Sequence, residues 1–469
     1  MKIAIIGAGP AGLAAAYVLA GNDGEVTLLE KEGFVGGISR TIEKNGYRFD
    51  LGGHRFFSKN SEINAFLNNL IGEELVDVSR QSRIYFKNKY FDYPLQPRNA
   101  VFGLGFIAAS QILYSYIWQR LKKVFSQREI ITLQDWVVDK FGQKMFELYF
   151  KSYSEKVWGI SCDRIAAEWV AQRIKGMSLT AAIKSAVMPR PKDAPLTLLR
   201  QFQYPRLGIG RICERMAESV NKNNRVILNS PIVSVNVEKN QIKSLVSKTV
   251  LGQTQIYTAE EFVSSMPITE LLTSMNPAAP KDIIGAASQL RYRDVIIVTL
   301  MLDKEKVTDD TWLYIHEPKI KFGRIHEPKN WSTDMSPVGK TSLVIEYFCF
   351  EGDSIWNKTD AELAQDAIRD LVEKLGFIKE KDVNGYCVVR VKKAYPMYEL
   401  GYKKYLNKIL DFLSGFKNLQ LVGRNGTFRY NNMDHSIEMG MKAAKRILGH
   451  SEDVLAVNDS NEYLEEIRS

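Results

Sequence analysis

The stretch KIAIIGAGPAGLAAAYVLAGNDGEVTLLE, residues 2–30, decides the fold of the part of the chain that contains it. Its apolar run at 2–6 predicts a short buried strand, and the alanine-rich segment 11–20 predicts a helix. A second apolar run at 25–30 predicts another strand. Because a helix between two short strands favours parallel pairing, the stretch predicts a βαβ unit at the start of an α/β fold.

Three glycines occupy the turn between the first strand and the helix. In GAGPAG, Gly7 permits the tight turn, Gly9 lets the backbone approach a pyrophosphate, and Gly12 lets the helix touch the strand. The helix N-terminus then offers free N–H groups to the phosphate charge. Glu30 ends the second strand, where its carboxylate can accept hydrogen bonds from ribose hydroxyls. Since glycines, helix and acid occur in register, they predict a dinucleotide site.

Composition narrows the class of protein. The 469-residue chain predicts two or three structural units. Its 63 basic and 54 acidic residues are interspersed, so the net charge of +9 argues against nucleic-acid binding and favours an anionic small molecule or a membrane surface. No signal-peptide pattern precedes the first strand, so export is not expected. Four widely spaced cysteines predict no zinc site and suit a reduced cytoplasmic compartment: Cys162, Cys213, Cys349 and Cys387.

The hydrophobic pattern changes several times along the rest of the chain. From about 96 to 188, apolar residues at three- and four-residue spacing predict helices. The segments 226–265 and roughly 286–350 predict strands, and 360–375 predicts an amphipathic helix. The strand NLQLVG and the helix HSIEMGMKAAKRILG follow near the end. Strand–helix units at the start, middle and end therefore predict one discontinuous domain with other units inserted.

The uncharged segment 100–119, AVFGLGFIAASQILYSYIWQ, has about the length of a membrane span but contains several polar residues and glycines. We favour a helix buried in a helical subdomain. The alternative is a shallow membrane contact, with the basic RLKK that follows at the headgroups.

A second glycine-rich stretch, EKEGFVGGISRTIEKNGYRFDLGGH, follows the βαβ start. Its two GG pairs bring backbone close to a bulky group twice, which a nicotinamide site does not require. The stretch resembles the flavoprotein superfamily of amine oxidases, protoporphyrinogen oxidase and UDP-galactopyranose mutase, in which these segments line FAD. The resemblance implies FAD contacts from Gly37, Ser39 and Gly53, and an adenine-side contact from Ile232.

The run LVGRNGTFRYNNMDH, residues 421–435, resembles the C-terminal signature of UDP-galactopyranose mutases. A helix that begins here, capped by Asp434 or Asn432, would aim its N–H groups at the negative end of a reduced flavin. Arg424 would add a full charge near the flavin ring. Tyr430 and Asn432 are implied as substrate contacts, with the Tyr430 hydroxyl on a phosphate.

Further segments along the chain also resemble mutase motifs. YSEKVWG and AEWVAQRI contain Trp158 and Arg173, which are 15 residues apart, and WLYIHEPKIKFGRI contains Tyr314 ten residues before Arg324. AYPMY contributes Tyr395. The resemblance implies that Trp158 packs beside a base or sugar, that the two arginines fork onto a diphosphate, and that both tyrosines bind it. His54, in FDLGGHRFF, is expected beside flavin N5 without an acid–base role.

The resemblance implies a nucleotide-sugar mutase in which reduced FAD presents N5 to the anomeric carbon. The expected fold is α/β: a Rossmann-type FAD-binding domain (1–95, 190–270 and 390–469), an inserted helical subdomain (96–189) and an inserted antiparallel β-sheet substrate domain (271–389). Two rival functions stay open. One is an FAD-dependent oxidase or desaturase of the protoporphyrinogen or carotenoid kind, anchored through 100–119, and the other is a flavin-binding scaffold without turnover.

Overall fold

A computed structural model of the chain describes residues 1–93, 105–125, 129–171, 201–249 and 251–458. Its organising element is a five-stranded sheet in which every neighbouring pair is parallel. The strand order is β20 (Leu419–Leu421), β13 (Glu261–Ser264), β1 (Lys2–Ile6), β2 (Glu25–Leu29) and β9 (Arg225–Ile227). Strands from the start, middle and end of the chain therefore form one discontinuous unit.

Alternate residues of β1 enter two different cores, because successive side chains of a strand point to opposite faces. Ile3 and Ile5 pack in the core with α1 (Pro10–Ala20), α10 (Gly210–Val220) and α16 (Met433–Ile447). Ala4 and Ile6 pack in the core on the other face. That second core includes a four-stranded sheet and three helices: β10 (Ile232–Glu238), β11 (Gln241–Lys248), β12 (Thr254–Thr258), β14 (Met275–Asn276), α11 (Ile268–Thr273), α12 (Lys281–Ala287) and α14 (Tyr402–Ser414).

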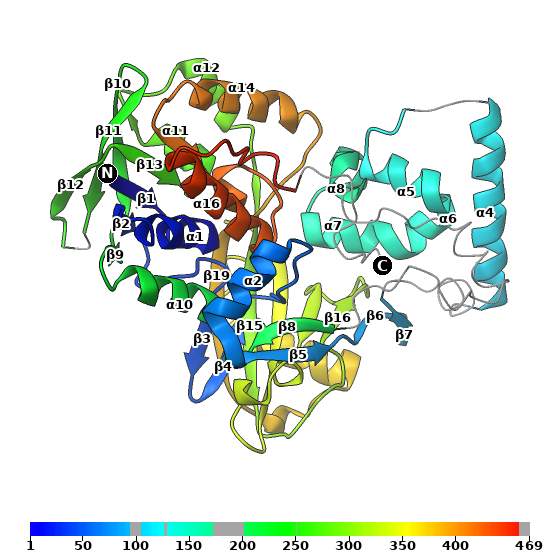
Figure 1. Ribbon diagram of the computed structural model, residues 1–469. Helices are drawn as coiled ribbons and strands as arrows, with labels where there is room; N and C mark the ends of the chain where they lie inside the picture. The colour runs from blue at the N-terminus through cyan, green and yellow to red at the C-terminus, as the bar shows by residue number, and fades with distance from the viewer. Residues whose placement is uncertain (94–104, 126–128, 172–200, 250, 459–469) are drawn as a thin grey trace.

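Helices α1 and α16 cross in close contact over the sheet (Figure 1). A Cβ on Gly440 of α16 would lie 2.1 Å from the Ala11 carbonyl oxygen of α1. Only glycine permits this backbone approach. The contact brings the middle of the last helix to the first turn of α1, although the two helices are more than 400 residues apart.

A seven-stranded sheet forms the second large unit. Its order is β19 (Val383–Pro396), β15 (Tyr292–Leu302), β18 (Thr341–Cys349), β17 (Arg324–His326), β16 (Trp312–Ile315), β6 (Ser82–Phe86) and β7 (Lys89–Asp92). One face packs with α13 (Asp360–Arg369) in a core that includes Ile296 and Ile345. The opposite face contributes Ile297, Val344 and Phe348 to a core with β4 (Tyr47–Asp50). This second face turns toward the glycine-rich segment.

The sheet includes two strands that the expected domain boundary at residue 95 assigns elsewhere. β6 pairs with β16 in parallel, from Ser82 opposite Trp312 to Tyr85 opposite Ile315, and β7 pairs with β6. Residues 82–92 therefore belong by hydrogen bonding to the seven-stranded sheet, which is antiparallel except for the β6–β16 pair. Sequence patterns could not show this, because the pairing joins segments about 230 residues apart.

The helical layer comprises α4 (Phe106–Phe125), α5 (Leu133–Phe141), α6 (Gln143–Met145), α7 (Ser152–Trp158) and α8 (Ala167–Ala171). Figure 1 shows α4 at the outer edge of this layer, with α5 to α8 between it and the parallel sheet. The expected burial of this helix holds for one side only: Ala109, Ile112 and Tyr116 are buried, while Phe106 and Ile117 are exposed. Within the described residues, no helix is long and apolar enough to cross a membrane.

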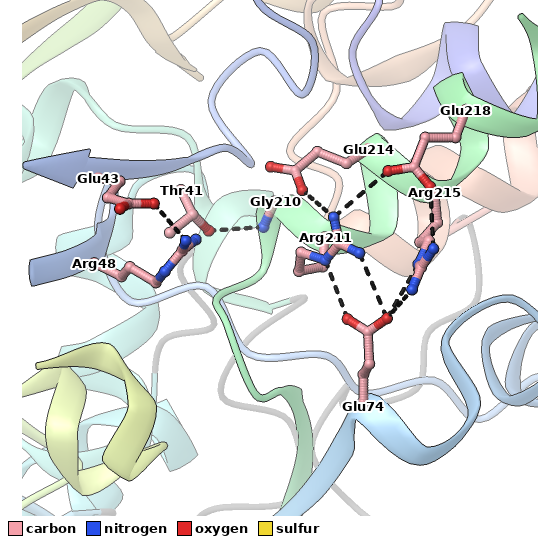
Figure 2. A network of polar contacts seen from close by, with 9 residues as sticks. All are labelled: Thr41, Glu43, Arg48, Glu74, Gly210, Arg211, Glu214, Arg215 and Glu218. Atoms are coloured by element: carbon pink, nitrogen blue, oxygen red, sulfur yellow. Dashed lines mark hydrogen bonds and ion pairs between the residues drawn. The ribbon is translucent and has the colours of Figure 1, made fainter. Parts of the chain in front are cut away.

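An ion-pair network attaches α10 to the strands beside it (Figure 2). Arg211 donates to Glu74 at 3.1 Å and to Glu214 at 2.6 Å, and Arg215 also binds Glu74. Glu74 directly precedes β5 (Leu75–Ser79), which pairs with β8 (Gln201–Pro205). At the start of α10, the Gly210 N–H donates to the Thr41 hydroxyl at 2.9 Å, which connects the helix to β3 (Thr41–Lys44).

Candidate functional site

The glycines of the turn before α1 differ in how much space surrounds them. Gly7 has a φ of +95°, and a Cβ on Gly12 would lie 2.0 Å from the Gly7 carbonyl oxygen. By contrast, a Cβ on Gly9 would meet no atom within 4 Å. Gly9 caps α1 without a side-chain hydrogen bond to the first N–H groups. The helix therefore presents its N-terminus to an open space that can accept an anion.

The second glycine pair lies on the same open space. The Gly36 N–H donates to the Ala8 carbonyl at 2.8 Å, and the nearest atom to a Cβ on Gly37 would be the Gly9 Cα, at 3.7 Å. Ser39, which is buried, donates its N–H to the Gly36 carbonyl at 2.9 Å. This segment is thereby held against the GAGPAG turn.

Glu30 and the start of β10 lie at the other side of that turn. The buried Glu30 carboxylate accepts the Ala8 N–H at 2.7 Å and the Glu32 N–H at 3.0 Å. The Ser230 N–H donates to the Glu30 carbonyl at 2.7 Å, which brings the strand that begins at Ile232 beside the acid. The chain thus holds an oriented carboxylate next to the glycine turn, and the strand that begins at Ile232 starts two residues after the Ser230 contact.

The C-terminal signature folds around the start of α16. Asn432 is the N-cap of this helix, and its N–H donates to His435 Nδ1 at 3.3 Å. Asp434, the other capping candidate, is the second helical residue; burial raises the pKa of its carboxyl, and its Oδ1 is buried without a partner. The raised pKa follows from burial, which disfavours the ionised form of this carboxyl.

The Arg424 guanidinium donates hydrogen bonds to backbone carbonyl groups. It donates to the Asn431 carbonyl from Nε at 2.9 Å and from Nη2 at 2.7 Å, and to the Ala394 carbonyl from Nη1 at 3.1 Å. Its guanidinium also lies 4.9 Å from the Tyr430 ring centroid and 5.4 Å from that of Tyr395. The arginine therefore supplies a positive charge while it holds the loop that precedes α16.

A row of polar side chains crosses the seven-stranded sheet. In the register, Tyr314 of β16 lies opposite Arg324 of β17, which lies opposite Glu346 of β18. Arg324 Nη2 donates to the Glu346 carboxylate at 2.5 Å and to the Tyr395 hydroxyl at 3.0 Å, while its Nε is buried without a partner. Tyr395 stacks on Tyr430, with 5.6 Å between ring centroids. Four residues from the sequence hypothesis therefore meet, together with Glu346.

The end of α7 adds an aromatic wall to this cluster. Trp158 is buried, with its ring centroid 6.5 Å from that of Tyr395, and its Nε1 has no partner. Arg293 holds the helix end: it donates to the Val157 carbonyl at 2.9 Å and to the Phe348 carbonyl at 2.9 Å. Burial lowers the pKa of Arg293 to about 10, which leaves it charged at neutral pH. The position of Trp158 thus depends on an arginine from β15.

Two histidines near Arg324 are held neutral. Burial, together with the charges of Arg424 and Arg324, lowers the pKa of His54 to about 3. Burial, Arg324 and His54 lower the pKa of His326 to about 3. The Nδ1 atoms of both are buried without a partner. Burial by itself disfavours the charge of Arg324, but Glu346 and the neighbouring tyrosines raise its pKa well above the usual value. Arg324 therefore keeps its positive charge, whereas the imidazoles of His54 and His326 are neutral.

The sequence analysis did not predict Glu346 and His326 as site residues, although the sequence around each of them indicates a role. Glu346 is the only charged residue within the apolar strand TSLVIEYFCF, and a buried carboxylate requires a cationic or hydrogen-bonding partner. His326 lies two residues after Arg324, so strand alternation places both on one face. Arg173, the other expected diphosphate ligand, lies outside the described residues.

The sequence pattern of the family described as "Flavin containing amine oxidoreductase" matches residues 10–448. The chain belongs to this family. Protoporphyrinogen oxidase 2, chloroplastic/mitochondrial, from Arabidopsis thaliana is 22% identical over 489 residues, covering 96% of this chain and 94% of that protein.

Solved structures have the same fold. The crystal structure of reduced UDP-galactopyranose mutase matches with a TM-score of 0.85 and 20% identity, covering 99% of this chain and 97% of that one. Cyclohexylamine oxidase from Brevibacterium oxydans IH-35A matches with a TM-score of 0.66 and 14% identity, covering 95% and 98%. The expected superfamily and α/β fold are confirmed.

FAD is the cofactor of this family member, as the sequence predicted. The described residues fit it: Gly9 leaves room at the start of α1, Glu30 presents a carboxylate beside that space, and buried polar atoms of His54 and Asp434 lack protein partners. Among the residues that the structure describes, no group of His, Cys, Asp or Glu could hold a metal ion. The protein is an enzyme of the FAD amine oxidase superfamily.

Proposed function

We propose that this flavoenzyme interconverts the pyranose and furanose forms of a nucleotide-diphosphate sugar, in the manner of UDP-galactopyranose mutase. The observation that supports this best is the meeting of Arg324, Tyr314, Tyr395 and Tyr430 at the sheet face that carries Glu346. A guanidinium with aromatic hydroxyl groups around it is suited to a diphosphate, because these groups donate hydrogen bonds to its oxygens. The fold of the reduced mutase, which spans nearly the whole chain, is consistent with this function.

In this proposal, reduced FAD supplies N5 as the nucleophile toward the anomeric carbon. The residues of the chain stabilise the nucleoside diphosphate as it leaves. Arg324 offers its Nε–H, which is buried and has no protein partner, and Tyr395 adds a hydroxyl. Trp158 closes the apolar side of the pocket. Because His54 and His326 stay neutral, neither adds a charge to the site.

Glu346 changes the charge balance that two arginines alone would give. The buried Glu346 carboxylate binds Arg324 directly, so the pair is close to neutral before substrate arrives. Two further cations are then needed to match the two charges of a diphosphate. We propose Arg173 and Arg424 for that role, the latter lying over the Tyr395 and Tyr430 rings.

A second candidate is an FAD-dependent oxidase, which the similarity to Arabidopsis protoporphyrinogen oxidase 2 along almost the full chain favours. An oxidase gives no physical reason for an arginine and tyrosines to share one face of the sheet, so we rank it below the mutase.

A panel experiment separates the two. The protein, reduced with dithionite, is incubated with UDP- and dTDP-sugars, and the products are examined by NMR for a change in ring size. The mutase predicts ring contraction or expansion with at least one sugar and no net redox change. Oxygen consumption with apolar substrates, combined with unchanged sugars, would instead support the oxidase.

A further inference from the structure

One side of α4 is an exposed apolar surface, here called the α4 apolar face. Its residues recur at helical spacing and are each 46–74% exposed: Ile107, Leu113, Tyr114, Ile117, Trp118 and Leu121. The ends of the helix continue it, since Phe106 is 83% and Phe125 is 88% exposed. Clustered large apolar side chains at this exposure mark a surface that contacts something other than water.

The opposite side of α4 has its own partners. Ala109, Ile112 and Tyr116 are buried, and the last two belong to the core formed with α5 and α6. A Cβ on Gly142, which separates these helices, would lie 3.0 Å from the Tyr116 Cα. The helix is thus held closely along one side, and its α4 apolar face does not result from a missing internal contact among the described residues.

The charges on α4 are all positive. The helix contains no Asp or Glu, and its last turns carry Arg120, Lys122 and Lys123. Lys123 is paired with Asp139 at 2.8 Å, whereas Lys122 forms no ion pair with any described residue and lies 5.6 Å from the Trp118 ring centroid. A lysine beside a tryptophan at the edge of an apolar stripe suits the boundary between acyl chains and headgroups.

We propose that α4 binds the surface of a bilayer that contains acidic lipids, with its α4 apolar face in the interface and Lys122 at the headgroups. The apolar stripe beside a basic flank is the arrangement of helices that lie in the interfacial plane. The net charge of +9 on the whole chain adds attraction to such a surface. A second copy fits less well, because α4 offers no carboxylate to meet the lysines of another α4. This inference does not depend on the proposed function.

Co-sedimentation of the full FAD-loaded protein with vesicles tests the proposal. We expect binding to phosphatidylcholine vesicles that contain phosphatidylglycerol, and weaker binding to phosphatidylcholine alone or in about 1 M salt, where charge screening acts within about 3 Å. Ile117→Glu should reduce binding at least tenfold, since it buries a charge in the interface. Lys122→Glu should reduce it about fivefold or more, because one basic residue near an acidic surface contributes about that factor.

Two control variants introduce the same types of substitution at exposed positions away from α4. Leu251→Glu alters an 86% exposed leucine and Lys239→Glu an 89% exposed lysine, both in loops of the four-stranded sheet, and both should bind like the wild type. Vesicles with brominated acyl chains should quench part of the tryptophan fluorescence of the wild type. This quenched part should be absent in Trp118→Phe.

Absence of vesicle binding by the wild type, or equal losses in the control variants, overturns the proposal. So does light scattering that detects a dimer which Ile117→Glu dissociates while vesicle binding stays unchanged, since the face would then be occupied by a second copy.

Discussion

The ion pair between Arg324 and Glu346 is both a structural and a proposed functional feature, and substitutions can separate the two. The side chain of Glu346 is 2% exposed and that of Arg324 is 18% exposed. Removing one partner of a buried pair leaves an uncompensated charge, which costs about 3–5 kcal/mol, whereas replacing both with apolar residues is often neutral. The double variant is therefore expected to fold like the wild type.

We predict that Arg324→Ala loses on the order of 2–4 kcal/mol of transition-state stabilisation, because one charged donor is removed from the leaving diphosphate. It should also unfold at lower urea concentration. Arg324→Met/Glu346→Leu should regain stability but not kcat/KM. Activity near that of the wild type in the double variant would contradict a diphosphate role for Arg324, whatever the stability.

His316 lies outside the proposed pocket and offers a direct test of acid stability. Its ring stacks on Tyr153, with centroids 4.1 Å apart, and burial together with Lys156 lowers its pKa from 6.5 to about 3. The unfolded chain therefore binds a proton between pH 6.5 and 3 that the folded chain does not. The stability that this group contributes is present above pH 6.5 and is lost as the pH falls.

We predict that stability decreases on acidification from pH 6.5, and that His316→Phe reduces the slope by up to about 1.4 kcal/mol per pH unit. Urea unfolding at several pH values measures this. The comparison uses slopes rather than absolute stability, because the substitution also removes a hydrogen bond to the Tyr149 backbone. Burial raises the pKa of Asp50 to about 7, which acts in the opposite direction in both proteins and cancels in the comparison. Equal slopes would show that His316 is protonated in the folded protein.

At the scale of elements, the end of α7 is held by a close contact that one glycine permits. Gly159 has a φ of +68°, and a Cβ there would lie 2.5 Å from the Arg293 Nη1 and 2.8 Å from Phe350. Gly376 ends another helical segment with a φ of +65°, and a Cβ there would meet no atom within 4 Å. The two glycines thus share their backbone conformation and differ in their surroundings.

We predict that Gly376→Ala costs about 1 kcal/mol, the strain of a left-handed residue, and that Gly159→Ala costs about 1–3 kcal/mol more because the Cβ displaces Arg293. Thermal unfolding of both variants measures the difference. Gly159→Ala should also alter the fluorescence of Trp158, the preceding residue, whereas Gly376→Ala should not. Equal costs would mean that Arg293 moves aside freely.

Local elements could be predicted from the sequence, whereas cross-strand partners could not. The expected strands at 2–6 and 25–30 and the helix at 11–20 match β1, β2 and α1 to within one residue at each end, because hydrophobic periodicity and the glycine turn act within a few residues. Glu346 lies 22 residues from Arg324, and only the register of β17 and β18 brings them together. The position of β6 in the seven-stranded sheet depends on register in the same way.

The same distinction holds for α4. Its apolar residues predicted a helix, and the described part of that segment is helical from Phe106 to Phe125. Which side of the helix would find a partner was not encoded in its own composition, because that depends on the few side chains of α5 and α6 that reach it. Hydrophobic periodicity therefore predicted the helix, but the burial expected for it holds on one side only.

At the scale of the whole molecule, the proposed cofactor contacts come from segments far apart in the chain. The GAGPAG turn, the segment 30–54, the start of β10 and the start of α16 surround one region. Gly53 lies against the seven-stranded sheet, since a Cβ on Gly53 would be 3.6 Å from the Trp312 ring. A ligand that binds only this assembled arrangement stabilises the folded state by RT ln(1 + [L]/Kd), about 2.7 kcal/mol at 100 times Kd.

Gly9 provides a way to remove that stabilisation without disturbing the apoprotein. A Cβ at Gly9 meets no protein atom within 4 Å, and the same is true of Gly285 in α12, so neither Gly9→Ala nor Gly285→Ala creates a clash in the protein itself. We predict that without FAD neither variant melts below the wild type, since Gly→Ala without a clash is neutral or slightly stabilising, and that added FAD raises the Tm of the wild type and Gly285→Ala but much less that of Gly9→Ala. Flavin absorbance retained after gel filtration gives an independent reading of the same loss. A Gly9→Ala protein that keeps its flavin and its full Tm shift would show that the pyrophosphate does not approach this backbone. The proposed contact between the GAGPAG turn and the cofactor would then be wrong.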